Sequence, residues 1–358
     1  MAARWTGGKP GLAILACCAG LACAAVTTGL RAATAYVSSE SGGIAVIDLD
    51  RLEVTRTLDP GGKGPRGLAI SADGKYLLTA NKATGDLSVI DTRDGQVLRR
   101  VPIGKNPEFV RVSGGQAFVT YEPGERTGAP GAAPDAPVQP KAGDDAPVPA
   151  EIAVIDLAQW RVTRAIPSGL ETEGIEFSPD GRRLLVTNEG DDTISVYERA
   201  SGRRVGLLKA PPGSRPRGIK VSPDGRRYIV TLESGNAFIV LDAGDYRILQ
   251  TVPTRNGPYG VAFDRAGKRL FIAASRADTL QVFDANSYQN IADIPTGKRC
   301  WHFSFTPDDT RLLLACGRSN AVYVVDAQTY RPVRQFDGLA LSWGVVTYPK
   351  SAGTLDAP

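Results

Sequence analysis

The residues best suited to chemistry lie in KRCWHFSF, residues 298–305, which holds the only histidine of the chain. His302 follows Trp301 directly and stands two residues after Cys300. A lone imidazole can serve as a general base, as a metal ligand or as a hydrogen-bonded structural residue. Together with Cys316 the segment would offer only three donors, too few for a closed zinc site without help from a glutamate or water.

Carboxylates are the other candidates, because a pair of them can exchange protons with a substrate. Glu108 and Glu173 are the two acids whose places in the chain invite this interpretation. The sequence contains no Gly-x-Ser-x-Gly elbow, phosphate-binding loop, dinucleotide fingerprint or metalloprotease motif. A Ser-His-Asp set would have one possible base. The sequence therefore favours a non-catalytic protein.

Short strands must position these residues, because the chain repeats one β-rich unit. The unit is clear in GIEFSPDGRRLLVTNEGDDTISVYE (174–198) and GIKVSPDGRRYIVTLESGNAFIVLD (218–242). An acid closes its third run at spacings of 42 to 44 residues, with one spacing of 65 where sequence is inserted. Seven copies result, marked by Asp48, Asp91, Asp156, Glu198, Asp242, Asp284 and Asp326. We expect these acids to cap turns rather than to react.

Four short runs in each repeat are typical of a β-propeller. We predict an all-β fold with seven blades of four antiparallel strands. The first unit begins at AYVSSE (35–40), which matches a second strand, and WGVVTYP (343–349) at the end matches a first strand. The C-terminal strand is therefore expected to complete the N-terminal blade and to close the ring.

Residues 1–32 are predicted to be a signal peptide, with residues 33–358 as a single propeller domain. Arg4 and Lys9 precede a small, apolar run over 11–30. A retained membrane anchor is the rival interpretation. A lipoprotein is another, because Cys17, Cys18 and Cys23 lie in that run. Export would place the protein in the periplasm, where Cys300 and Cys316 can form a disulfide.

Removal of residues 1–32 lowers the net charge from +4 to +1, because Arg4, Lys9 and Arg31 leave with no acid. No basic patch then remains to suggest nucleic acid as a partner. After removal no membrane association is expected, and we expect a monomer.

The repeats TANKATGDLSVIDT and VTNEGDDTISVYE resemble the YVTN family of β-propellers, which are WD40-like. The similarity covers nearly the whole chain after residue 32. It is greatest to periplasmic propellers associated with PQQ-dependent alcohol catabolism, especially between Trp301 and Val346. This resemblance implies a binding or scaffold accessory of a quinoprotein pathway. Its partner would be a periplasmic redox protein, a quinoprotein dehydrogenase or a small molecule, with no cofactor firmly implied.

The repeats differ in side-chain type at the start of strand one. The middle residues there are Arg66, Glu108, Glu173, Arg217, Tyr259, Trp301 and Trp343. The next position is Gly in five of the seven copies, and Phe109 and His302 are the exceptions. We predict that the seven middle residues and His302 surround the channel mouth and bind a ligand or partner. The alternative is that these side chains pair with one another and plug the channel.

Cys300 and Cys316 break the repeat pattern together. If residues 307–309 form a three-residue loop, Thr306 pairs with Thr310 and Cys300 lies opposite Cys316. That arrangement is compatible with a disulfide. A register shifted by one residue would instead turn the two thiols to opposite faces.

The segment 123–150 is rich in Pro, Ala and Gly and is predicted to be a flexible insertion in the third blade. It connects strand two to strand three and so should emerge on the mouth face. It could act as a lid or partner contact, or be a tolerated insertion.

Two further functions stay open. Resemblance to the haem-binding propellers of periplasmic nitrite reductases would make His302 an axial haem ligand. Sugar lactonases also have seven blades, and that comparison would make Glu108 and Glu173 an acid–base pair.

Overall fold

The computed structural model describes residues 1–4, 6–7, 33–123 and 148–356. The chain divides into two units, residues 1–31 and 32–358. Most of the predicted signal peptide and most of the predicted insertion lie outside the described residues, so both stay predictions. Within the described ranges no helix is both long and apolar enough to span a bilayer.

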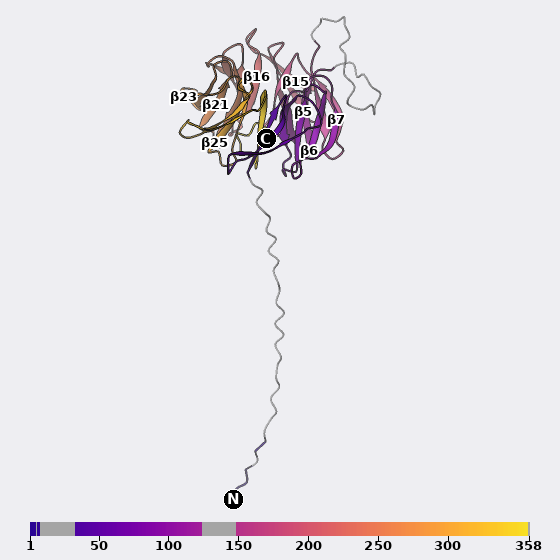
Figure 1. Cartoon of the computed structure of the whole chain (residues 1–358), viewed down its shortest axis with the longest axis vertical. Coiled ribbons are helices and arrows are strands. Elements are labelled where there is room, and N and C mark those ends of the chain that lie inside the picture. The colour runs from indigo at the N-terminus through magenta and orange to yellow at the C-terminus, as the bar shows by residue number, and fades with distance from the viewer. Residues whose placement is uncertain (5, 8–32, 124–147, 357–358) are drawn as a thin grey trace. The chain divides into compact units, whose positions relative to one another are not determined.

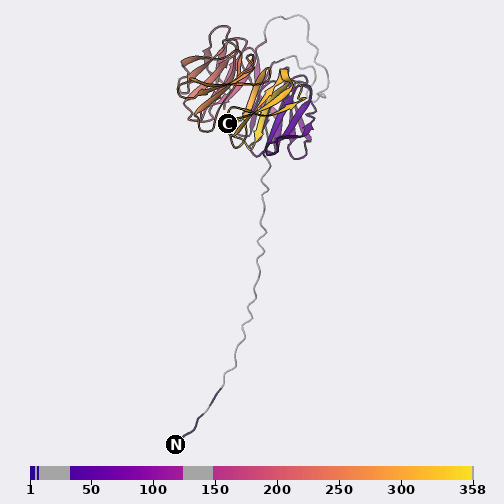
Figure 2. The same cartoon turned by 60° about the vertical axis from the view of Figure 1, so that its left-hand side comes forward.

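The described residues between 33 and 356 form seven sheets of four strands, each strand pairing antiparallel with its neighbour (Figures 1 and 2). The predicted seven-bladed propeller is thereby confirmed. Strand one of each blade contacts strand one of the next blade around a central axis. These inner strands are β28 (Ser342–Tyr348), β4 (Pro65–Ile70), β8 (Val110–Ser113), β12 (Thr172–Phe177), β16 (Pro216–Val221), β20 (Pro258–Phe263) and β24 (Cys300–Phe305).

The second and third strands of each blade are almost wholly buried, as their apolar runs require. The second strands are β1 (Thr34–Ser39), β5 (Tyr76–Asn81), β9 (Gln116–Tyr121), β13 (Arg183–Asn188), β17 (Arg227–Leu232), β21 (Arg269–Ala274) and β25 (Arg311–Cys316). The third strands are β2 (Gly43–Asp48), β6 (Asp86–Asp91), β10 (Glu151–Asp156), β14 (Thr193–Glu198), β18 (Ala237–Asp242), β22 (Thr279–Asp284) and β26 (Ala321–Asp326).

The fourth strands are the outer edges of the blades and carry polar residues together with several exposed aliphatic ones. They are β3 (Glu53–Leu58), β7 (Val97–Pro102), β11 (Arg161–Pro167), β15 (Arg204–Lys209), β19 (Ile248–Pro253), β23 (Asn290–Pro295) and β27 (Pro332–Asp337). A 3₁₀ turn, η1 (Gly317–Ser319), follows β25.

Closure of the ring follows the prediction. β28 pairs antiparallel with β1, with Tyr348 opposite Thr34 and Val345 opposite Val37. Figure 2 shows the yellow C-terminal strands beside the indigo N-terminal ones. Without β28 the inner edge of β1 would be unpaired, so the two ends of this unit must meet before the first blade is complete.

The predicted turn chemistry is also present. In the β12–β13 hairpin, Gly181 has a φ of 67° and donates its N–H to the Ser178 carbonyl at 2.8 Å. After the third strand of the fifth blade, an Asp242 carboxylate oxygen accepts the N–H groups of Gly244 and Asp245 at 2.8 and 3.2 Å. Such bonds fix the turn, which explains why an acid recurs there.

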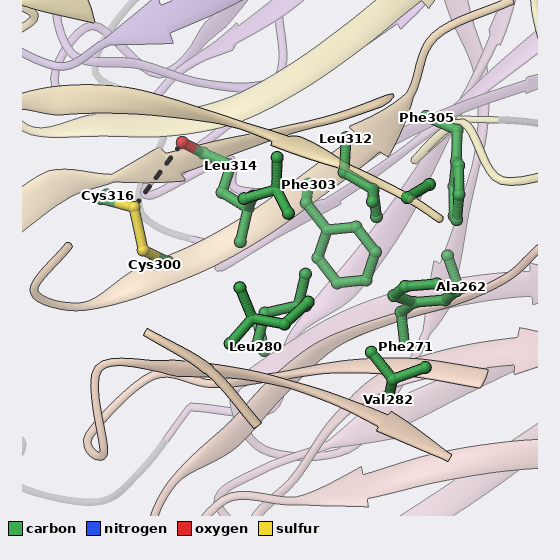
Figure 3. Packing of buried hydrophobic residues seen from close by; sticks show 14 residues of the cluster. Ala262, Phe271, Leu280, Val282, Cys300, Phe303, Phe305, Leu312, Leu314 and Cys316 are labelled. Carbon is green, nitrogen blue, oxygen red and sulfur yellow. Dashed lines mark hydrogen bonds between the residues drawn. A yellow bond between two sulfur atoms is a disulfide. The ribbon is translucent and has the colours of Figure 1, made fainter. Parts of the chain in front are cut away.

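Packing between blades is aromatic and aliphatic. Between the sixth and seventh blades, Phe303 and Phe305 of β24 meet Phe271 of β21, with the Phe271 and Phe305 ring centres 5.1 Å apart (Figure 3). The interior between these two blades is therefore filled with side chains.

Candidate functional site

One backbone feature starts every strand one. A left-handed residue, with φ between 49° and 71°, stands directly before the strand in six blades and four residues before β8 in the third. These residues are Gly64, Asn106, Glu171, Arg215, Gly257, Arg299 and Leu341. In six blades a β-bulge follows within the strand. A bulge re-aims the side chain beside it, here toward the axis.

A cavity of about 290 Å³ opens at this end of the channel. All seven middle residues of the strand-one starts line it: Arg66, Glu108, Glu173, Arg217, Tyr259, Trp301 and Trp343. The four charged residues come from consecutive blades and the three aromatic ones from the rest of the circle. Several of these side chains pair with one another, yet they leave this volume open. Binding of a ligand or partner there remains a prediction.

Arg217 is the centre of the charged arc. Its guanidinium contacts Glu173 and Glu189 and donates to Glu233 at 2.8 Å. The hydroxyl of Tyr259 lies 3.2 Å from the same guanidinium and donates to Glu173 at 3.3 Å. Because its donors are engaged on several sides, Arg217 holds this arc rigid.

Glu108 lies beside the second guanidinium of the mouth. Arg66 donates to Glu108 at 2.5 Å and to Glu40 at 2.8 Å. Burial, and after it the negative charge of Glu173, raise the pKa of Glu108 to about 7, although Arg66 and Lys82 oppose the shift. A carboxyl poised between its two protonation states at neutral pH suits proton transfer.

Two tryptophans, Trp301 and Trp343, form the larger part of the aromatic arc. The Arg299 guanidinium lies 5.7 Å from the centre of the Trp301 ring, and Arg66 lies 5.8 Å from that of Trp343. The Trp301 ring rests on Gly317, where an added Cβ would come within 1.9 Å of it. Flat apolar faces beside charged groups suit a ring-shaped polar ligand.

His302 does not line this cavity, which corrects the prediction that it belongs to the mouth. Its side chain is buried below, at 4% exposure, among Trp343, Tyr259 and Phe109, with ring centres 4.3, 5.2 and 5.6 Å away. Burial, and then the charges of Arg217 and Arg66, lower the pKa of His302 to about 3. The bulge at Trp301 explains why the prediction for His302 was wrong. It turns the Trp301 and His302 side chains to different depths along the channel.

His302 has no hydrogen-bond partner at Nδ1 or Nε2 among the residues that the structure describes. It faces an internal cavity of about 20 Å³, room for about one water. A haem does not fit there, so the structure gives no support to His302 as an axial ligand. Nor do three or more His, Cys, Asp or Glu side chains of the described ranges gather as a metal site.

Cys300 and Cys316 are joined in a disulfide and pair directly across β24 and β25 (Figure 3). The register at the hairpin differs from the prediction, because the Thr306 N–H donates to Arg311 and not to Thr310. That shift of one residue would have separated the thiols. The bulge between Cys300 and His302 restores the pairing.

Sequence reasoning missed a second group of lining residues. Four of them are the left-handed residues Asn106, Glu171, Arg215 and Arg299, and Glu122 and Glu189 follow second strands. The left-handed position is Gly in only two of the seven repeats and carries a side chain in the other five. Comparing the repeats at this position, as was done for the middle residues, would therefore have identified these lining residues.

Comparison with known proteins supports the fold. The profile of the family described as "Lactonase, 7-bladed beta-propeller" matches residues 172–331. These blades are similar to lactonase propellers. The match covers less than half of the chain and includes Glu173 and Arg217 but not Glu108. The sequence matches no curated protein.

Solved structures share the architecture at low identity. The Pseudomonas aeruginosa periplasmic gluconolactonase is 20% identical, with a TM-score of 0.69 over 90% of this chain and all of its own. A candidate 6-phosphogluconolactonase from Bacteroides fragilis is 18% identical, with a TM-score of 0.70 over 90% of this chain and 99% of its own. Hydrazine synthase from Kuenenia stuttgartiensis is 21% identical, with a TM-score of 0.66 over 80% of this chain and 90% of its own. Identities this low show the fold alone.

Proposed function

We propose that the mouth cavity hydrolyses a cyclic ester of a sugar acid. The observation that carries the proposal is Glu108, whose pKa is raised to about 7 where it lines an open cavity beside a guanidinium. The lactonase profile over residues 172–331 supports the same class of reaction.

The chemistry requires a base, a stabilised oxyanion and a proton for the leaving oxygen. Deprotonated Glu108 takes a proton from the attacking water as its oxygen bonds to the ester carbonyl carbon. The guanidinium of Arg66 stabilises the oxyanion. When the ring C–O bond breaks, Glu108 returns the proton to the leaving alkoxide, and one water and one lactone give one hydroxy acid. Trp301 and Trp343 form the wall against which the sugar ring packs.

The test is hydrolysis of a panel of aldonolactones, neutral and phosphorylated, followed by acid release. Glu108→Gln should lower kcat/KM by about 100-fold or more, because it removes the base. Glu122→Gln is the matched control, since Glu122 lines the same cavity and is bonded to Asn106 at 3.0 Å. Wild-type protein that accelerates no lactone above its spontaneous rate would refute the proposal.

A second candidate is a binding accessory of PQQ-dependent alcohol oxidation in the periplasm, without catalysis. The charged and aromatic residues that line the mouth favour this candidate, because aromatic and arginine side chains are common where proteins recognise a partner. The pathway rests only on the resemblance of the repeats. Simultaneous substitution of Arg66, Arg217 and Trp301 should abolish capture of a purified quinoprotein dehydrogenase or its cytochrome. Unchanged capture, or none by the wild type, would refute it.

A further inference from the structure

Each strand one carries a further side chain three positions after its middle residue. These residues are Ala69, Arg111, Glu176, Lys220, Ala262, Ser304 and Val346. Three adjacent blades contribute charges, and the others contribute small or uncharged residues. Arg111 and Glu176 are paired at 2.8 Å, and Lys220 lies 3.6 Å from Glu176, all of them buried.

The C-terminal tail, residues 350–356, packs against β24. The Leu355 N–H donates to the Ser304 hydroxyl at 2.8 Å, and the Phe305 N–H donates to the Gly353 carbonyl at 3.3 Å. An added Cβ on Gly353 would come within 2.2 Å of the Phe305 ring. The tail therefore follows a path shaped for its own backbone.

Asp356 is the charged end of this path and is fully buried. Its Oδ2 accepts the N–H of Ile70 at 2.7 Å and lies 2.8 Å from the Lys350 ammonium. A buried carboxylate is costly unless charges and donors compensate it, and here one backbone amide and the Lys350 ammonium both contact Oδ2. Oδ1 has no hydrogen-bond partner among the residues that the structure describes.

We infer that the Ile70 N–H and the Lys350 ammonium form a carboxylate-binding site whose resident ligand is the side chain of Asp356. The site recognises a carboxylate as such, so a small free carboxylate fills it when the aspartate side chain is removed.

The test is chemical rescue in the full-length chain. Asp356→Ala should lower Tm, and acetate should raise it again in a saturable way beyond NaCl at equal ionic strength. Wild-type protein and Asp50→Ala, which alters an exposed acid, should show only the NaCl effect. Adding Lys350→Met to Asp356→Ala should remove the rescue. An acetate effect no larger than that of NaCl would overturn the inference.

Asp356→Asn keeps the shape and removes the charge, so it serves if the alanine variant does not fold. Hydrogen exchange should then become about tenfold faster at the amides of Ile70 and Leu355, the loss of about one charge-assisted hydrogen bond. Exchange as slow as in the wild type would show that the carboxylate does not hold the tail.

Discussion

At the residue scale, burial decides what His302 does. The imidazole lies among three aromatic rings below the mouth, so its charged form is disfavoured. We predict that it stays neutral throughout the physiological range. As the single histidine, it should give one set of imidazole resonances in proton NMR.

Those resonances should not move between pH 5 and pH 8, because the pKa of His302 is lowered to about 3. The unfolded chain binds a proton near its ordinary pKa of about 6.5. The contribution of His302 to stability is therefore complete above that value and declines as pH falls toward the folded pKa. A titration midpoint near 6.5 would contradict the buried placement.

Glu108 depends on its neighbour Glu173. Glu173 is the second cause of the raised pKa of Glu108, after burial. Glu173→Gln should therefore lower the pKa of Glu108 from about 7 toward its ordinary value, without restoring it fully. Carbon-detected NMR of labelled glutamate side chains measures this shift. An unchanged pKa would mean that the two carboxylates do not interact.

At the element scale, the disulfide fixes β24 to β25 where both strands reach the mouth. Replacing Cys300 and Cys316 with serine should lower the free energy of unfolding by about 2–4 kcal/mol. Urea denaturation with and without a reductant checks this. Trp301 follows Cys300 and its ring rests on Gly317, so its fluorescence should change as well. Equal stability of the reduced and oxidised proteins would contradict a clamping role.

The same hairpin shows where sequence reasoning reaches its limit. Alternating apolar residues and the repeated acids predict each strand, because burial and turn capping act on neighbouring residues. The register of β24 against β25 depends on a bulge at Trp301, which no local pattern announces. The sequence therefore allowed the disulfide through a three-residue hairpin loop, whereas in the structure the bulge brings Cys300 opposite Cys316.

At the scale of the whole molecule, the ring closes through one strand. A chain ending at residue 341 lacks β28, leaves the inner edge of β1 unpaired and should not unfold cooperatively. A chain ending at residue 349 keeps β28 and should fold with lower stability. Calorimetry of the two truncations separates these outcomes. Cooperative unfolding of the shorter chain would show that closure is dispensable.

The seven repeats predict the fold, its closure and the seven residues that line the mouth. Depth along the axis was not predictable, because two residues adjacent in sequence, Trp301 and His302, end at different levels of the channel. The position of the C-terminal tail was not predictable either, since Asp356 contacts Ile70, which lies 286 residues earlier in the sequence. Contacts of that range depend on the closed ring.

The most direct test of the account is the pH dependence of kcat/KM for lactone hydrolysis by the wild type and by Glu108→Gln. A base must be deprotonated to act, so the wild-type value should rise with pH to a plateau with a midpoint near 7, the pKa of Glu108. In the variant, kcat/KM should be lower by about 100-fold or more, and the midpoint near pH 7 should be absent. A wild-type profile that is flat through pH 7, or a variant as active as the wild type, would contradict the assignment of Glu108 as the base.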